Sequence, residues 1–148
     1  MNLFHFAVIV LISIAAIIIL LSNVAGILEE SKDVEKYSQG LFLMKSIDKV
    51  IKELITEEGG AKRIVTNNAG LVIASDSDNT IKFSLDISED FLDAGDYKEE
   101  SVKIIARKGR IELLLNYTGF VDIIGNVSTT QNLFIEKIND TAIRIDKR

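Results

Sequence analysis

Residues 3–28 read LFHFAVIVLISIAAIIILLSNVAGIL and contain no charged side chain. Seventeen of these 26 residues are Leu, Ile, Val or Phe. A helix of this length spans about 39 Å, which is enough to cross the ~30 Å hydrocarbon core of a bilayer. Each such side chain near the helix centre favours membrane insertion by roughly 0.3 to 0.6 kcal/mol, so the sequence predicts a helix that is stable in a membrane.

Three interpretations of this segment remain open. A cleaved secretory signal needs basic residues before a short apolar region, whereas this run is long and no Lys or Arg precedes it. A plain membrane anchor usually has Lys or Arg beside it, but this run is followed by Glu29-Glu30-Ser31-Lys32-Asp33. The third interpretation is the N-terminal helix of a mature chain whose basic leader has been removed, which predicts the missing basic flank.

The rest of the chain has the composition of a water-exposed domain. All 17 Lys and Arg residues and all 22 Asp and Glu residues follow Leu28, and the net charge is −5 at pH 7. Nucleic acid is therefore not an expected partner, because neutralising its phosphates needs a surplus of Lys and Arg. The chain has no Cys, and its single His, His5, lies in the apolar run. We therefore expect no enzyme activity, no cofactor and no metal site.

A second helical pattern follows the apolar run directly. Its apolar residues recur at steps of three and four, which predicts an amphipathic helix over residues 29–60. No Pro interrupts residues 1–58, so one continuous helix of about 55 residues is expected, with Ser38-Gln39-Gly40 as the weakest point because Gly costs about 1 kcal/mol relative to Ala. Gly59-Gly60 is predicted to end the helix. The predicted apolar stripe comprises Val34, Tyr37, Leu41, Met44, Ile47, Val50, Ile51, Leu54 and Ile55, and Asp48 is placed on the opposite, polar side.

Residues 61–148 are predicted to form an antiparallel β-sheet domain. The periodicity changes to two, and turn residues such as Asp76-Ser77-Asp78-Asn79 separate short runs rich in Val, Ile and Leu. Closely spaced strands favour antiparallel hairpins, because parallel pairing needs long crossovers. The fold class is thus α+β, with one long helix packed on one face of a sheet. The predicted strands are Lys62–Thr66, Leu71–Ala74, Thr80–Asp86, Val102–Ala106, Arg110–Tyr117, Phe120–Ile124, Asn132–Ile138 and Ala142–Asp146.

Two acidic segments are candidates for calcium or catalytic sites. The stretch Ile87–Glu100 lacks ligands at the offsets of a calcium loop, and Asp76-Ser77-Asp78-Asn79 lacks the Gly and the final Glu of that motif. No pair of carboxylates stands out as a candidate for glycoside hydrolysis. Solvated loops are the expected role of both segments.

Three N-x-[ST] sequons occur in the last 33 residues, at Asn116, Asn126 and Asn139. About one such sequon is expected by chance in a chain of this composition. The alternative to glycosylation is ordinary turn composition. If this part of the chain is outside the cell, we expect these three Asn residues to carry glycans.

The layout of an apolar helix, an amphipathic helix and an antiparallel sheet resembles that of archaeal type IV pilins and pilin-like proteins. At the residue level the resemblance covers Ser46–Asp86, SIDKVIKELITEEGGAKRIVTNNAGLVIASDSDNTIKFSLD, where a helix ends at an acidic-Gly corner. A basic strand, a Gly turn and the strand Asn79-Thr80-Ile81-Lys82-Phe83 follow this corner. The sequence departs from bacterial pilins, because His5 stands at their usual Glu position, the helix lacks a Pro kink and the chain has no Cys.

The resemblance implies a structural subunit that polymerises through its N-terminal helix into an extracellular filament, with surface adhesion as its use. It further implies residence in the membrane before assembly, processing by a signal peptidase and export by a pilus assembly machinery. The small residues Ala7, Ala15, Ala16 and Gly26 would allow close helix approach. The residues then expected in the filament core are Phe4, Phe6, Ala7, Leu11, Ala15, Ile17, Ile18 and Leu21.

Two rival functions stay open on the sequence alone. The first is a membrane-anchored extracytoplasmic binding or sensor module that does not polymerise. The second is an extracytoplasmic hydrolase that uses acidic residues, for which the sequence offers no candidate pair.

Overall fold

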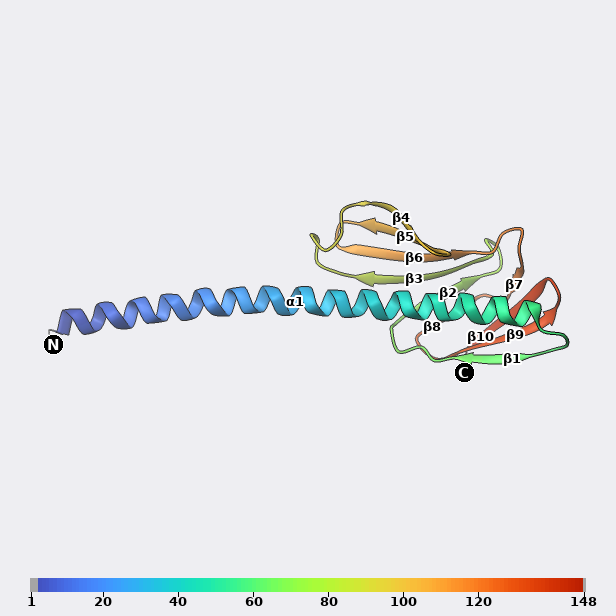
Figure 1. Ribbon diagram of the computed structural model, residues 1–148, viewed down its shortest axis with the longest axis horizontal. Coiled ribbons are helices and arrows are strands. Elements are labelled where there is room, and N and C mark those ends of the chain that lie inside the picture. The colour runs from blue at the N-terminus through green and yellow to red at the C-terminus, as the bar shows by residue number, and fades with distance from the viewer. Residues whose placement is uncertain (1–2, 148) are drawn as a thin grey trace.

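The chain begins with one uninterrupted helix, α1, that spans Leu3–Thr56 (Figure 1). The computed structural model describes the backbone of residues 3–147 and the side chains of residues 12–147. The single continuous helix predicted from the sequence is confirmed, and it passes through Ser38-Gln39-Gly40 without a break. Ten strands follow within residues 57–147: β1 Lys62–Val65, β2 Val72–Ser75, β3 Thr80–Asp86, β4 Gly95–Glu99, β5 Val102–Arg107, β6 Arg110–Asn116, β7 Asp122–Ile124, β8 Val127–Thr129, β9 Leu133–Asn139 and β10 Ala142–Lys147.

The strands form two sheets on opposite sides of the C-terminal half of α1 (Figure 1). The four-stranded sheet has the order β1-β9-β10-β7, and the six-stranded sheet has the order β4-β5-β6-β3-β2-β8. We call these two sheets, together with residues 33–56 of α1, the head. The N-terminal half of α1 projects away from the head as a free rod (Figure 1).

The α+β layout is confirmed, but the prediction of one antiparallel sheet on one side of the helix is wrong in two respects. There are two sheets, and the chain passes from one to the other four times, after β1, β6, β7 and β8. In addition, β7 pairs with β10 in parallel. Residues 125–141, which include β8 and β9, supply the long connection that parallel pairing requires.

Two strands were missed by the sequence analysis. β4 lies inside the acidic stretch Ile87–Glu100 that was expected to be a solvated loop, and it forms an edge of the six-stranded sheet. Its pairing with β5 is supported by an ion pair from Asp96 to Lys103 at 2.9 Å rather than by an apolar pattern. β8 has three residues, and the alternation of three residues is too short to be recognised as a strand.

The core of the head is the apolar stripe of α1 enclosed by the inner faces of both sheets. Met44, Ile47, Ile51 and Leu54 are completely buried, as their place in the predicted stripe requires. Val34, predicted in the same stripe, is 52 % exposed, because at 100° per residue it points away from the face that carries Met44, Ile47, Ile51 and Leu54. The remaining core is built by side chains that alternate inward along the strands, among them Ile81, Phe83, Leu113, Leu115, Ile135, Ile143 and Ile145.

Gly40 lies against the ring of Phe83 on β3, which explains a Gly in the middle of a long helix. A Cβ atom at position 40 would lie 2.5 Å from Cε1 of Phe83, well inside van der Waals contact. The ring cannot retreat, because it is 2 % exposed and a Cβ atom at Gly70 would lie 3.3 Å from its other edge. Gly40 lowers the helix propensity, but it allows α1 to pack closely on the six-stranded sheet.

The C-terminus of α1 is held by a buried cation from another element. Lys137 of β9 is 6 % exposed, and its Nζ donates to the carbonyl oxygens of Ile55 at 3.2 Å and Glu57 at 2.6 Å. The last helical turn has no basic residue of its own, so this ammonium group satisfies free carbonyls and compensates the helix dipole. Gly59, at φ +88°, then turns the chain toward β1, in agreement with the predicted helix end.

We predict that Gly40→Ala lowers the free energy of unfolding of the head by about 1–3 kcal/mol, because overpacking outweighs the roughly 1 kcal/mol gained in helix propensity. Gly26→Ala is the matched control, since no atom other than the local helix backbone lies within 4 Å of its new Cβ. Chemical unfolding of the full chain in detergent, followed by circular dichroism, measures both. Equal stability of the two variants would refute the packing role of Gly40.

Candidate functional site

The most unusual surface of the molecule is the part of α1 before the head, residues 12–28, which we call the apolar segment. Its large side chains are 49–65 % exposed, and it carries no charge. Within the described residues, α1 is the one helix long and apolar enough to cross a membrane, with a mean hydropathy of 2.2 in a window of which nothing is buried. Ser22 is polar, but its Oγ donates to the carbonyl of Ile18 in the same helix at 2.9 Å, so it needs no hydrogen-bond partner outside the helix.

The apolar segment is apolar on every side of the helix. At 100° per residue, Ala15, Ile17, Ile18 and Leu21 cover an arc of about 160°. Ile19, Leu20 and Ile27 point to the remaining side of the helix, and all seven residues are exposed. Of the other predicted filament-core residues, Phe4, Phe6, Ala7 and Leu11 lie outside the residues whose side chains are described, as does His5. A helix that is apolar all round is stable only when it is surrounded, either by lipid or by several protein neighbours.

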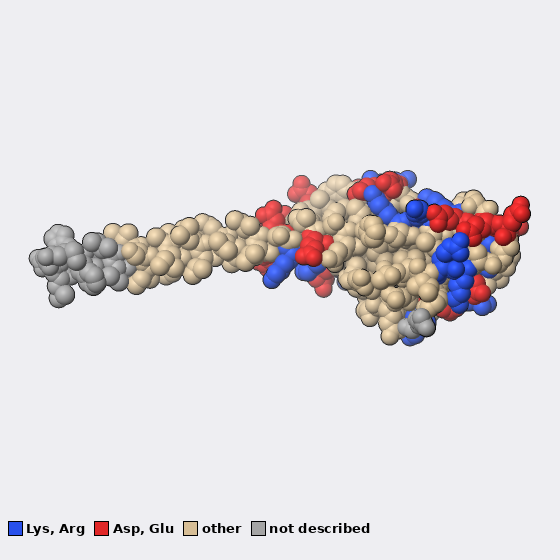
Figure 2. Space-filling view, turned by 60° about the horizontal axis from the view of Figure 1, so that its bottom comes forward, with Lys and Arg blue, Asp and Glu red and all other residues tan. Residues whose placement is uncertain are grey.

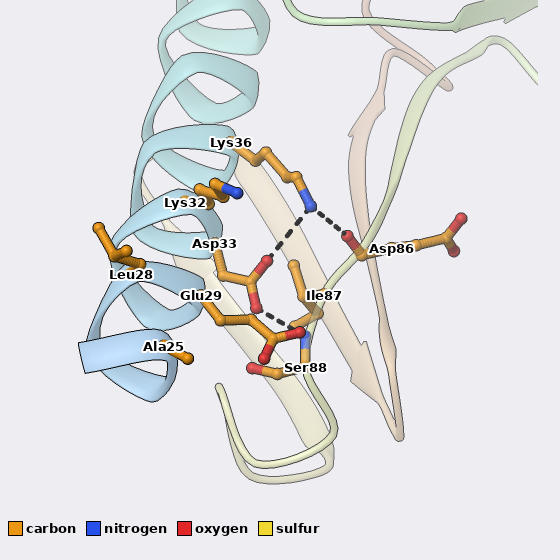
Figure 3. Close-up of a pocket in the computed structure, with 9 residues that line it drawn as sticks. All are labelled: Ala25, Leu28, Glu29, Lys32, Asp33, Lys36, Asp86, Ile87 and Ser88. Atoms are coloured by element: carbon orange, nitrogen blue, oxygen red, sulfur yellow. Dashed lines mark hydrogen bonds and ion pairs between the residues drawn. The ribbon is translucent and has the colours of Figure 1, made fainter. Parts of the chain in front are cut away.

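The junction between the apolar segment and the head is held by the side chain of Asp33 (Figure 3). Its Oδ2 accepts the backbone N–H of Ser88 at 2.7 Å, and its Oδ1 accepts a hydrogen bond from Lys36 Nζ at 3.3 Å. Lys36 also donates to the carbonyl of Asp86 at 3.4 Å. Asp33 is 3 % exposed, so these bonds fix the helix to the end of β3 where the helix leaves the head.

The bonds made by Asp33 also set its titration. The backbone N–H of Ser88 lowers the pKa of the Asp33 carboxyl below its ordinary value of 3.8, and the Ser88 and Lys36 side chains add to this effect against the opposing effect of burial. The carboxylate therefore remains ionised, and the junction intact, at neutral pH.

An open cleft of about 540 Å³ lies at this junction (Figure 3). One wall is α1, which contributes apolar Ala25 and Leu28 together with charged side chains of both signs, and the other wall is the end of β3 and the residues after it, Asp86–Ser88 (Figure 3). The most buried of the charged side chains, Asp33, already uses both of its oxygens within the protein. In the described part of the chain, no three His, Asp or Glu side chains come together as a metal site.

The acidic segments singled out in the sequence have structural roles. Asp96 pairs with Lys103 and Arg107, Glu89 pairs with Lys108 at 2.6 Å, and Glu99 pairs with Lys45 of α1 at 2.7 Å. The side-chain hydrogen bond from Lys103, with smaller contributions from both cations, lowers the pKa of Asp96 below 3.8. Asp76-Ser77-Asp78-Asn79 is the turn of the β2–β3 hairpin, and Asn79 adopts a left-handed conformation there.

The three sequon asparagines are all exposed on the head. Asn116 ends β6 and Asn139 ends β9, and each accepts a hydrogen bond at 2.9 Å from the backbone N–H two residues later, in a local turn. Asn126 lies between β7 and β8, where its Oδ1 accepts the backbone N–H of Asp76 at 3.2 Å. Their side chains are thus exposed at or near turns of the head.

A buried polar cluster in the head was missed by the sequence analysis. Asp48, placed there on the polar side of the helix, is 7 % exposed, and its carboxylate accepts hydrogen bonds from Tyr117 at 3.0 Å, Ser101 at 2.6 Å and Lys52. Burial, together with the adjacent Asp48, raises the pKa of the Tyr117 hydroxyl, which stays a hydrogen-bond donor. The available signal was the spacing, since Asp48 falls between Met44 and Ile51 in the apolar stripe. This cluster joins α1 to the residue just before β5 and to the residue just after β6.

Comparison with known proteins adds no family. No protein-family model matches the chain, and no solved structure matches it.

We predict that Asp33→Asn lowers the free energy of unfolding at pH 7 by about 1–3 kcal/mol, because one of the two donors at the junction loses its acceptor. Since the folded pKa of Asp33 is lowered, its contribution is complete well above pH 3.8 and is lost as the pH falls through the folded pKa. The deficit of the variant should therefore shrink in acid. Urea unfolding at several pH values measures it, and hydrogen exchange should show a faster Ser88 amide.

Glu35→Gln is the control for this experiment, because Glu35 is an exposed carboxylate on the same part of α1 that bonds only to Gln39 among the contacts described. A deficit of equal size in both variants, or one independent of pH, would show that Asp33 does not hold the junction.

Proposed function

We propose that the chain is a structural subunit of an archaeal type IV pilus-like extracellular filament, and that the filament serves surface adhesion. The observation that supports this most directly is the apolar segment, a rod exposed on every side, joined without a break to a head that completes its own core. In this proposal the chain is a polymer-forming protein and has no catalytic role.

The physical basis of this proposal is that the apolar segment can be covered either by lipid or by other subunits. In the membrane, lipid covers the apolar segment, so a single subunit is stable there. Outside the membrane, each Å² of uncovered apolar surface costs about 25 cal/mol, so the segment must be covered by the segments of neighbouring subunits. A helix that is apolar on all sides can be covered by several neighbours at once, which is the requirement for a filament core.

The geometry of the chain also suits an open polymer. The head lies at one end of the rod, so copies that overlap along their apolar segments place their heads at successive levels outside the core (Figure 1). Such a heterologous contact does not close on itself and continues as a helical filament. Ala15, Ala16 and Gly26 would let neighbouring helices approach closely, and in the single subunit there is open space where a Cβ at Gly26 would lie.

The exposed positions of Asn116, Asn126 and Asn139 support glycan attachment on the surface of the head. Glycans at these turns would coat the outside of the filament without touching the apolar segment. A signal peptidase and a pilus assembly machinery are the partners that this function requires.

We predict that cells producing the wild-type chain shed thin filaments in which this polypeptide dominates, seen by negative-stain electron microscopy of sheared material and identified by mass spectrometry. Ile18→Asp should abolish these filaments, because a carboxylate enclosed by neighbouring apolar helices loses its hydration. Insertion of the single subunit should survive, since one charge costs about 2.5–3.5 kcal/mol against the summed contribution of many Leu, Ile and Val residues.

Ile18→Leu is the matched control and should assemble normally. Circular dichroism and membrane fractionation check that Ile18→Asp keeps a folded head and reaches the membrane. Normal filaments from Ile18→Asp would contradict the assignment of the apolar segment as the filament core. A wild-type chain found only as a detergent-soluble monomer or dimer would instead support the anchored binding or sensor module.

A further inference from the structure

The head has one surface region without charge. Among the residues after Leu28, about one in three is Lys, Arg, Asp or Glu, compared with about one in four in a typical globular protein. After Leu28, four stretches of at least seven residues contain no charged residue. One is Leu113–Val121, in β6 and the turn after it, and the other three are Ser38–Met44, Ile64–Ser75 and Ile123–Ile135. These last three are far apart in the sequence and belong to three different parts of the fold.

The tertiary structure brings these three segments together. β2 of the second segment pairs with β8 of the third, and the backbone N–H of Asn67 donates to Oδ1 of Asn132 at 3.1 Å. The first segment joins them at a hollow of about 270 Å³ beside α1. This hollow is lined by Gln39, Phe42, Leu43, Thr66, Asn68 and Ala69.

The surface formed by the three segments, which we call the uncharged face, is apolar and amide-rich. Phe42 is 74 % exposed, which is the highest value among the exposed large apolar residues described. Leu71 and Ile73 are 43 % and 41 % exposed. The amide side chains of Asn68, in the same segment, and of Gln131, in the third segment, are also exposed. Figure 2 shows a wide expanse of the head without charged side chains.

The uncharged face is continuous with the apolar segment along one side of α1. At 100° per residue, Val24, Ile27, Val34 and Phe42 fall within an arc of about 80°. All four side chains are at least half exposed. An apolar strip therefore runs from the rod, past the junction, onto the open side of the head.

We propose that the uncharged face is the surface on which the head receives a second copy of this chain in the filament. The inference rests on the proposed function and adds to it a contact outside the helical core. Copies with a net charge of −5 repel one another, and they approach most easily where charge is absent. Depletion of charge together with an exposed aromatic residue is also typical of protein–protein interface cores.

Two of the three sequons lie off the uncharged face. Asn116 and Asn139 lie outside the three segments, whereas Asn126 lies within the third segment, where its Oδ1 accepts the backbone N–H of Asp76. Glycans at the first two positions would therefore not obstruct the uncharged face.

The chain has no Cys, so single cysteines can report which surface is covered. We would compare Leu71→Cys and Asn68→Cys on the uncharged face with Lys98→Cys on the exposed edge strand β4. For each variant, the rate of maleimide labelling is measured in intact filaments and in the same filaments dissociated in detergent. Circular dichroism of the dissociated subunits confirms that the head remains folded.

We expect labelling at positions 68 and 71 to be slower by about tenfold or more in filaments than in dissociated subunits, as for groups held in a closed interface. Lys98→Cys should change by less than about twofold between the two states if its strand faces solvent. Equal labelling in both states at positions 68 and 71, or the same protection at all three positions, would overturn the inference.

Two further outcomes need to be separated from a contact between copies. In the first, a bound glycan or lipid covers the face, and in the second, no filament forms. Protection that persists after dissociation and disappears when bound material is washed away would identify a glycan or lipid as the occupant, and would also overturn the inference. Electron microscopy of each sample precedes labelling. Verified filaments with no protection refute only the contact on the head, whereas absence of filaments from the wild-type chain refutes the proposed function itself.

Discussion

The burial of one stripe of α1 between two sheets is the constraint on which the rest of the molecule depends. Met44, Ile47, Ile51 and Leu54 lose all contact with solvent only because β-strands cover the helix from two sides. The close approach of Phe83 to Gly40 belongs to the same packing. Since this contact completes the core of the head, nothing in the head remains to cover the apolar segment, and that surface must be covered by lipid or by other copies.

Three buried charges hold α1 in one position along this packing. Asp33 ties its junction to Ser88, Asp48 ties its middle to Tyr117 and Ser101, and Lys137 ties its end to the carbonyls of Ile55 and Glu57. An apolar stripe alone permits sliding and rotation, whereas a buried charge is tolerated only where its partners are placed. The three contacts thus set how far the rod extends beyond the head, which matters for any assembly built on that rod.

Much of the architecture was predictable from local pattern. The absence of charge in residues 3–28, the lack of Pro and the three-four periodicity correctly predicted one long helix, and most strands were recognised from alternation and turn residues. The errors have identifiable causes. β4 is an edge strand held by ion pairs, β8 has three residues, and the parallel pairing of β7 with β10 depends on partners distant in sequence.

The sequence by itself determined that a charge-free rod precedes a strand-rich, acidic domain, because charge and periodicity are local properties of a chain. Only the tertiary structure decided that two sheets enclose α1, that Asp33, Asp48 and Lys137 are buried, and that three uncharged segments, one of which carries Phe42, lie next to one another. These features depend on which distant residues meet. Contacts between residues far apart in the sequence are set by strand pairing and by the packing of whole elements, and a single sequence carries no local signal for either.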